Sequence, residues 1–112
     1  MIGKTKNLTA TIDVSESTTV SSAVENYVHG QISGLIIPGT FTGTSVTFQG
    51  SYDGDTYTVL YLDGADYSMA VDESRWVVLD PTVFYGVPYV KVVSGSAEGA
   101  DREITVLTSK VL

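Results

Sequence analysis

Along most of this chain, apolar and polar residues alternate with a period of two. The first clear case lies near the start, where apolar residues occupy every second position from Leu8 to Val14, with Thr or Asp between them. Since successive side chains of a strand point to opposite faces, such a segment has one apolar and one polar face. The alternation recurs over 46–52, 57–61, 67–71, 90–92 and 104–106. The pattern predicts half-buried β-strands.

Two segments are more continuously apolar, Ile32–Ile37 and Trp76–Leu79. Such runs are typical of strands that are covered on both faces, or of strands at a contact between subunits. Both segments are therefore expected to be strands whose second face meets either the same domain or another chain.

The glycines and prolines mark where these strands turn. Asp53-Gly54 and Asp63-Gly64 separate alternating segments, and Asp-Gly pairs tolerate the positive φ angles of tight hairpin turns. The sequence therefore predicts a meander of three strands, at about 44–52, 56–62 and 66–72.

Three further segments have a less regular pattern. Pro81 to Gly86 predicts one short helical turn, because Pro suits the first position of a helix and Gly the position just past its end. Thr19–Val24 is expected to be a short strand, since its Ser, Thr and Val residues are poor helix formers. Gly95 to Ala100 consists mainly of small residues and is expected to be a flexible loop.

These elements together predict an all-β fold. About eight or nine short strands with frequent turns are typical of a two-sheet antiparallel sandwich, here expected to be a jelly roll. The length of 112 residues suits one domain over 1–112. Residues 1–6, which include Lys4 and Lys6, are expected to form a flexible N-terminal arm.

Composition narrows the class of partner. The mean hydropathy of +0.16 is high for a soluble monomer, so part of the apolar surface is expected to meet another subunit or protein. The net charge is 6 − 13 = −7, and an acidic surface repels the phosphate backbone of nucleic acids. No apolar run approaches the roughly 18 residues of a membrane span, and the N-terminus lacks the apolar segment of a signal peptide. Neither a nucleic acid nor a membrane is therefore expected as a partner.

No catalytic constellation is evident. Cysteine is absent, which excludes disulfides, thiolate metal sites and thiol catalysis. The single histidine, His29, has no G-x-S-x-G nucleophile motif to serve, and the stretch from Gly95 to Gly99 has Ala97 where the nucleophile would stand. We therefore expect no enzyme activity and no catalytic or cofactor-binding residues.

Four acidic residues lie close together in the sequence: Asp53, Asp55, Asp63 and Asp66. Pairs of carboxylates can divide acid and base roles, and groups of them can bind calcium. However, these residues lie in or beside predicted hairpin turns, where Asp serves backbone geometry, and the two turns fall at opposite ends of one strand. We expect a structural role and no metal site.

The tyrosines leave several interpretations open. Tyr52, Tyr57, Tyr61 and Tyr67 all fall on the predicted meander. They suit cross-strand packing in the core, a protein interface, or an exposed face that stacks on sugar rings. Trp76 is expected to anchor either the core or an interface.

Several segments between about residues 30 and 108 carry a resemblance to a known class of proteins. The segments are Ile32–Pro38, Val46–Gly54, Trp76–Pro81, Tyr89–Gly95 and a last strand after Ala100-Asp101-Arg102. In these segments, in length and in predicted architecture, the chain resembles the capsid decoration proteins of tailed bacteriophages. These are also called cementing or staple proteins, and epsilon-15-like podoviruses have one.

The resemblance implies a jelly-roll protein on the outer surface of a phage capsid. Such proteins bind the major capsid protein, often as dimers, and reinforce the shell. The chain would then be made in the bacterial cytoplasm and end in the virion, with a homo-oligomer, and a dimer in particular, favoured. The family has no catalytic residues to transfer, and it fixes no contact residues.

The expected contact residues come instead from the N-terminal arm and the aromatic anchors. They are Lys4, Lys6, Leu8, Trp76, Tyr85 and Tyr89. A second function class stays open, because Ser51 to Tyr57 also resembles a hairpin of discoidin-like carbohydrate-binding sandwiches. A tail or baseplate accessory protein is a third alternative.

Overall fold

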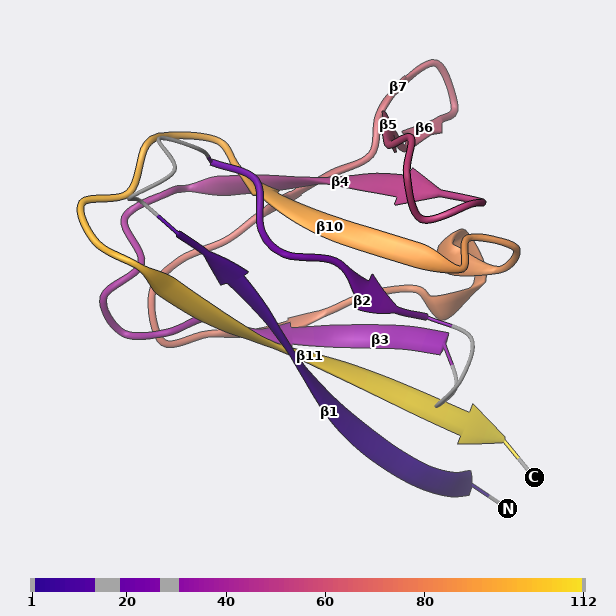
Figure 1. Cartoon of the computed structure of the whole chain (residues 1–112). Coiled ribbons are helices and arrows are strands. Elements are labelled where there is room, and N and C mark those ends of the chain that lie inside the picture. Colours follow the sequence, from indigo (N-terminus) through magenta and orange to yellow (C-terminus); the bar gives the residue numbers. More distant parts are fainter. Residues whose placement is uncertain (1, 14–18, 27–30, 112) are drawn as a thin grey trace.

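Two antiparallel sheets face each other in the computed structural model, which describes residues 2–13, 19–26 and 31–111, with side chains from Asn7 to Ser109 in these ranges (Figure 1). The first sheet has the order β1-β11-β3-β9, and its strands are β1 (Ile2–Ile12), β11 (Arg102–Val111), β3 (Gln31–Ile36) and β9 (Trp76–Val78). The second has the order β2-β10-β4-β5, with β8 also paired to β4, and its strands are β2 (Val24–Glu25), β10 (Tyr89–Ser94), β4 (Ser45–Ser51), β5 (Thr58–Val59) and β8 (Ser68–Ala70).

The order of the strands is that of a jelly roll. If β5 to β8 are counted as one interrupted strand, the eight successive strands are ordered 1-8-3-6 in the first sheet and 2-7-4-5 in the second. Eight antiparallel strands that cross back and forth between two sheets define this fold. The predicted all-β antiparallel sandwich is confirmed.

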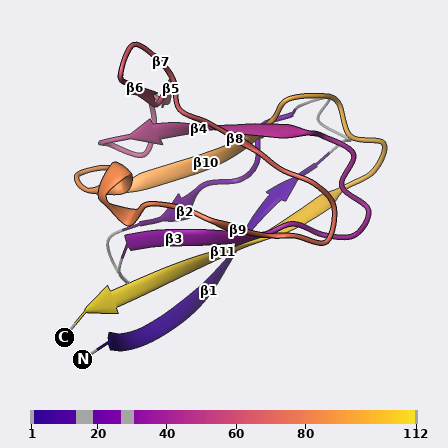
Figure 2. The ribbon, with the colours of Figure 1, turned by 180° about the vertical axis from the view of Figure 1, so that it is seen from behind.

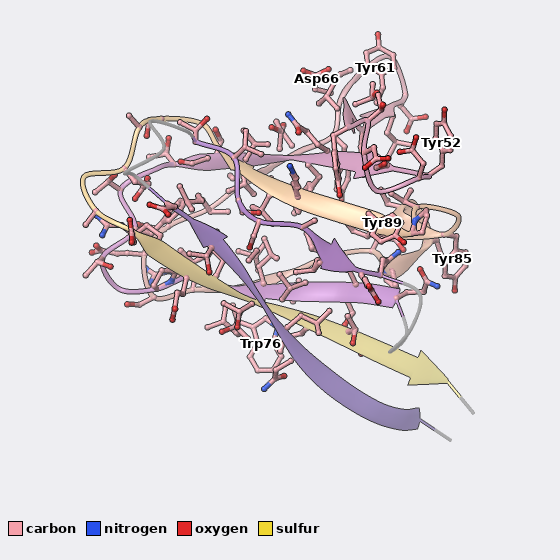
Figure 3. The ribbon with its side chains drawn as sticks, in the orientation of Figure 1. Tyr52, Tyr61, Asp66, Trp76, Tyr85 and Tyr89 are labelled. Atoms are coloured by element: carbon pink, nitrogen blue, oxygen red, sulfur yellow. The ribbon has the colours of Figure 1, made fainter. Side chains whose placement is uncertain are left out.

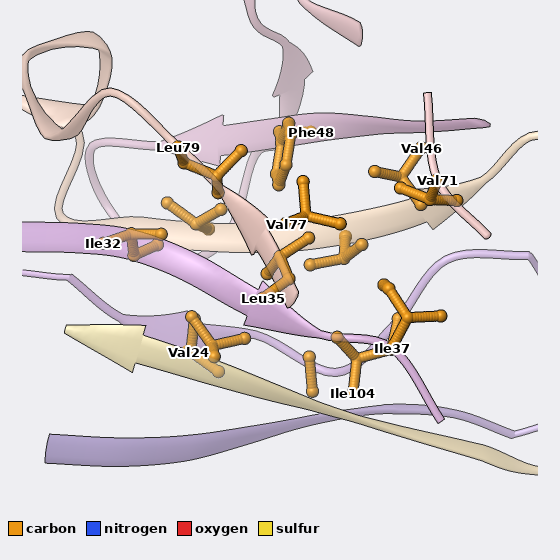
Figure 4. Packing of buried hydrophobic residues seen from close by; sticks show 14 of the residues in the cluster. Val24, Ile32, Leu35, Ile37, Val46, Phe48, Val71, Val77, Leu79 and Ile104 are labelled. Carbon is orange, nitrogen blue, oxygen red and sulfur yellow. The ribbon is translucent and has the colours of Figure 1, made fainter. Parts of the chain in front are cut away.

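The core fills the space between the sheets (Figure 4). Both sheets contribute residues at alternate positions of their strands, as the period of two predicts. Fully buried members include Leu35, Val46, Phe48, Val92 and Ile104. In the described parts of the chain, no helix has the length and apolar character needed to cross a lipid bilayer.

The predicted N-terminal arm is wrong for the described residues 2–6. They form the first part of β1 and pair with the end of β11, in a register that sets Thr5 opposite Ser109 and Lys6 opposite Thr108. The two strands therefore continue together as a ribbon to both termini (Figure 1). Sequence patterns around residues 1–6 do not show this partner, because it lies about a hundred positions away along the chain.

The predicted meander is present but interrupted. β4 pairs with β8 along its first half, from Ser45 to Thr47, and with β5 at Gln49 and Gly50. Between β5 and β8 the chain leaves the sheet as a hairpin of β6 (Tyr61–Leu62) and β7 (Ala65–Asp66), which projects from the domain (Figure 2).

The turn of this hairpin confirms its sequence signal. Asp63 and Gly64 both have positive φ angles, of 53° and 87°. Positive φ at both central positions defines the type I′ turn that suits the twist of a two-residue hairpin. The Asp-Gly pair therefore fixes where β6 ends and β7 begins.

Two of the less regular segments differ in outcome. Pro81–Phe84 is a 3₁₀ helix, η2, which the Asp80 carboxylate caps by accepting from the Thr82 N–H at 3.0 Å, so the predicted helical turn is confirmed. Thr19–Val24 is not a continuous strand. Val20 forms an isolated bridge with Val93. At the next residue, the Ser21 hydroxyl accepts from the Val92 N–H in place of a backbone carbonyl, which interrupts the ladder.

Candidate partner-binding face

Strand β9 has one buried and one exposed row of side chains. Val77 and Leu79 point into the core, whereas Trp76 and Val78 are 68% and 75% exposed. The continuous apolar run from Trp76 to Leu79 is therefore covered on one face only. The sequence predicted that the second face of this run meets either the same domain or another chain. The face is not covered by the described part of its own domain, so the second possibility is the one that remains.

Trp76 and Val78 belong to a larger apolar area on the outside of the first sheet. Together with Ile36 of β3 and Leu107 of β11 they line an open depression of about 560 Å³. The remaining lining residues are uncharged and polar: Asn7, Ser33, Thr105 and Ser109. We call this area the Trp76 face (Figure 3). None of the lining residues that the structure describes is charged, which suits the surface of another protein.

A glycine beneath the indole fixes how Trp76 lies. A Cβ atom placed on Gly34 of β3 would stand 3.0 Å from the indole Nε1 and 3.2 Å from the carbonyl oxygen of Val77. The indole Nε1 therefore comes so close to the neighbouring strand that only a residue without a side chain fits there. The aromatic ring is held on a sheet instead of on a loop.

The other side of Trp76 is more polar. A second depression, of about 370 Å³, lies between Trp76 and residues 70–72, with Arg75 on its rim. Arg75 and Asp72 form an exposed ion pair at 3.8 Å. Such a pair contributes little to stability, so these charges remain free to orient an approaching partner.

The predicted contact residues do not form one surface. Trp76 lies on the outer face of the first sheet. Tyr85, 62% exposed, lies at the end of the sandwich beside η2 (Figure 3). Tyr89 is half-buried, and its ring lies 3.5 Å from the position of a Cβ on Gly54.

The predicted contacts on β1 lie in a paired strand. Leu8 is half-buried and packs against the core, which leaves part of its side chain open, and its role as a contact residue stays a prediction. It continues the inward row of Ala10 and Ile12, whose alternation places it there. Lys6 lies opposite Thr108, whereas Lys4 falls in the register shift between Ile2 and Thr5, and the side chains of both lysines are outside the described residues.

The four meander tyrosines divide into two pairs. Tyr67 packs on Phe48 and Phe84, with ring centroids 5.6 and 6.1 Å away, and Tyr57 lies under the Lys91 ammonium at 4.2 Å. Tyr52 and Tyr61 are 83% and 68% exposed. The core interpretation holds for Tyr67, whereas Tyr52 and Tyr61 remain available to a ligand.

Asp53 has the structural role predicted for it. Its Oδ1 atom accepts from the N–H groups of Asp55 and Thr56, at 2.9 and 3.0 Å, and from the Ser51 hydroxyl at 2.9 Å. These bonds, led by that from Thr56, lower the pKa of Asp53. Among the described residues, no group of three or more His, Asp or Glu side chains could hold a metal ion, and His29 lies outside them.

Sequence reasoning missed a buried ion pair at one end of the sandwich. The Glu98 carboxylate accepts from Arg102 Nε at 2.9 Å, and also from the N–H groups of Thr42 and Gly43, each at 2.9 Å. Burial raises the pKa of Glu98, but these hydrogen bonds outweigh it and hold the pKa below the ordinary 4.5. The segment from Gly95 to Ala100, expected to be a flexible loop, is thus fastened through Glu98.

A buried amide at the opposite end of β10 was also missed. Asn26 Nδ2 donates to the carbonyl oxygens of Phe84 and Val87, at 2.7 and 2.9 Å, and to Gln31 Oε1 at 3.0 Å. Its Oδ1 accepts from the Ile32 N–H at 2.8 Å. One side chain therefore ties the start of β3 to the turn after η2.

No family model matches the chain, and the searches of curated proteins and solved structures find nothing similar to it. A function must therefore be inferred from the surfaces just described. The Trp76 face is the largest of them and the one with the clearest apolar character.

Proposed function

We propose that this protein is a non-enzymatic structural protein of a tailed-phage virion. It binds the outer surface of the capsid, with the major capsid protein as its partner, and stabilises the shell. The observation that carries the proposal is the Trp76 face, an apolar area that a folded chain leaves open to solvent. The resemblance of residues 30–108 to capsid decoration proteins selects the capsid among protein partners.

The chemistry of the Trp76 face favours a protein partner. Trp is enriched among the residues that dominate binding energy at protein interfaces, particularly where neighbouring residues exclude water from it. Here Ile36, Val78 and Leu107 lie around the indole, and the hydroxyls of Ser33 and Ser109 lie among them. The jelly roll itself does not decide the function, because both viral capsid proteins and lectins use it.

Stabilisation of the shell would follow from mass action. A protein that binds the assembled shell but not its dissociated subunits increases the free energy needed to disassemble the shell. The lattice repeats the same site many times, so a modest affinity at each copy adds up over the shell. No covalent chemistry by the chain is required.

The test is co-sedimentation with expanded capsids of the source phage that were assembled without this protein. We expect saturable binding at a stoichiometry that matches the lattice sites, and a higher temperature of shell disruption. Trp76→Ala should weaken binding by about 30-fold, the loss of an interface hot spot. Tyr61→Ala is the matched control, because Tyr61 is as exposed as Trp76 but lies off the Trp76 face. No binding to any capsid form would overturn the proposal, and binding to purified tails alone would replace it with a tail or baseplate role.

A further inference from the structure

A second depression that contains exposed aromatic residues lies at the end of the sandwich. Tyr52 and Tyr61, from the loop after β4 and from β6, both line a hollow of about 280 Å³. Figure 3 shows both side chains at the end of the domain away from Trp76. The rest of the lining, as far as the structure describes it, carries no charge: Gly50, Ser51, Thr56, Thr58, Val59, Leu60, Gly86, Val87 and Pro88. We call it the tyrosine hollow.

The floor of the tyrosine hollow is set by the inward row of β4. Val46 and Phe48 of this row are fully buried, but the next position is Gly50. A Cβ on Gly50 would stand 2.6 Å from Val87 Cγ1 and 2.8 Å from Leu60 Cδ2. The missing side chain lets these two residues close over the strand and leaves an apolar floor.

The two walls of the tyrosine hollow are fastened to the core. One wall, at residues 86–88, is held by Asn26, which bonds the carbonyl oxygens of Phe84 and Val87. The other is the β6–β7 hairpin, which is tied at its base by hydrogen bonds from the Leu60 N–H to Phe48 and from the Tyr67 N–H to Leu60. A hollow with such walls largely exists before a ligand binds, which reduces the cost of ordering it.

We propose that the tyrosine hollow binds a neutral saccharide, one sugar ring packing against the face of Tyr52 or Tyr61. A sugar ring has apolar C–H faces and a rim of hydroxyls, so it matches tyrosine, whose ring is apolar and whose tip is polar. The hydroxyls of Thr56 and Thr58 line the hollow and are available for hydrogen bonds. No described lining residue is charged, and Asp53 and Asp55 stand in the same loop as Tyr52 and Thr56. An anionic ligand would therefore lose hydration without finding a partner.

The site is independent of the proposed capsid contact. It lies on other strands than the Trp76 face and has no lining residue in common with it. A chain bound to a shell through the Trp76 face would therefore still be able to bind a saccharide.

The test is a titration of the ¹⁵N-labelled full chain, followed by NMR. The probes are defined neutral oligosaccharides of three to six units, built from glucose, galactose, mannose or N-acetylglucosamine. We expect at least one of them to cause saturable shifts of the amide signals of residues 50–61, 86 and 87. The double variant Tyr52→Ala, Tyr61→Ala should weaken this binding about tenfold, and Tyr85→Ala should not change it.

The proposal is overturned if no probe causes saturable shifts in these segments, or if the double variant binds as tightly as the unaltered chain. The NMR spectrum of the double variant without ligand shows directly whether it is folded. Capsid co-sedimentation of the same double variant separates the two proposals, because shell binding should persist in it.

Discussion

The Trp76 face and the tyrosine hollow both expose large aromatic side chains, yet the chain builds them differently. Trp76 lies on a strand, with its indole Nε1 close to Gly34, within an open apolar area of the first sheet. Tyr52 and Tyr61 rise from a loop and a hairpin around a small uncharged hollow. Exposure of an aromatic residue alone does not indicate its partner. The size and polarity of its surroundings do, with a wide apolar depression for a protein and a smaller hollow with hydroxyls for a sugar.

The two regions also depend on different parts of the fold. The Trp76 face depends on the pairing of β9 and β11 with β3 and on the space over Gly34. The tyrosine hollow needs Asn26, Gly50 and the base of the hairpin, which lie at one end of the sandwich. A substitution can therefore disturb the Trp76 face without the tyrosine hollow, or the reverse. Substitutions remote from both regions serve as a reference for effects on stability alone.

The largest effect is expected for Glu98→Ala, at the end of the sandwich remote from the tyrosine hollow. It should lower the free energy of unfolding by about 4 kcal/mol, because Arg102 is left buried without its partner. Guanidinium denaturation measures this effect. Asp72→Ala, which removes the carboxylate of an exposed ion pair, is the control and should change stability by less than about 0.5 kcal/mol. Equal effects of the two variants would show that Glu98 does not fasten its loop.

The same carboxylate predicts how stability depends on pH. Because the pKa of Glu98 is lower in the folded chain than the ordinary 4.5, its ionised form contributes stability above that pH. This contribution should be lost as the pH falls from about 4.5 through the folded pKa. Denaturation between pH 7 and pH 2, compared with Glu98→Gln, measures the difference. A Glu98→Gln variant with the same acid sensitivity as the unaltered chain would contradict this prediction.

Asn26→Ala should have the next largest effect and should act on one region only. It should lower the free energy of unfolding by about 3 kcal/mol, since the carbonyl oxygens of Phe84 and Val87 and the Ile32 N–H lose their partner. The folded fraction should still bind shells, but the wall of the tyrosine hollow should loosen. Hydrogen exchange at the amides of residues 84–87, compared with exchange in β9, would show this. Equal acceleration in both segments would contradict the separation of the two regions.

The smallest effects are expected for two glycine substitutions that should act reciprocally. Gly34→Ala should displace the indole and weaken shell binding, whereas Gly50→Ala should push Leu60 and Val87 into the tyrosine hollow. Each should cost about 1 to 2 kcal/mol of stability, as overpacking does. Gly99→Ala is the control, because a Cβ there meets nothing within 4 Å. If Gly34→Ala and Gly50→Ala changed shell and saccharide binding alike, the two regions would not be independent.

Local sequence signals predicted much of the fold. Alternation predicted the inward rows of β4 and β11, and Asp63-Gly64 and Pro81 predicted a turn and a helical turn that the structure confirms. The apolar run from Trp76 to Leu79 also indicated the exposed face. A strand buried on one face needs an apolar residue only at every second position, whereas this run is apolar at every position. These signals succeed because the residues involved act on their immediate neighbours.

The features that were missed depend on contacts between distant residues. Residues 2–6 form a strand because the end of β11 lies beside them, which their own composition does not show. Asn26 bonds to carbonyl oxygens about 60 positions away, and Glu98 bonds to the backbone of Thr42 and Gly43. A polar residue among small residues, such as Glu98, predicts a flexible loop as long as the distant groups that bind and bury it are unknown.

The most direct test of the central claim measures whether Trp76 becomes buried when the chain binds a shell. Trp76 is the only tryptophan of the chain, so replacing it biosynthetically with 5-hydroxytryptophan gives a probe that can be excited apart from the tryptophans of the capsid. The proposal predicts that bound chain is protected from acrylamide quenching relative to free chain. Equal quenching in the free and shell-bound chain would show that the Trp76 face is not the surface that binds.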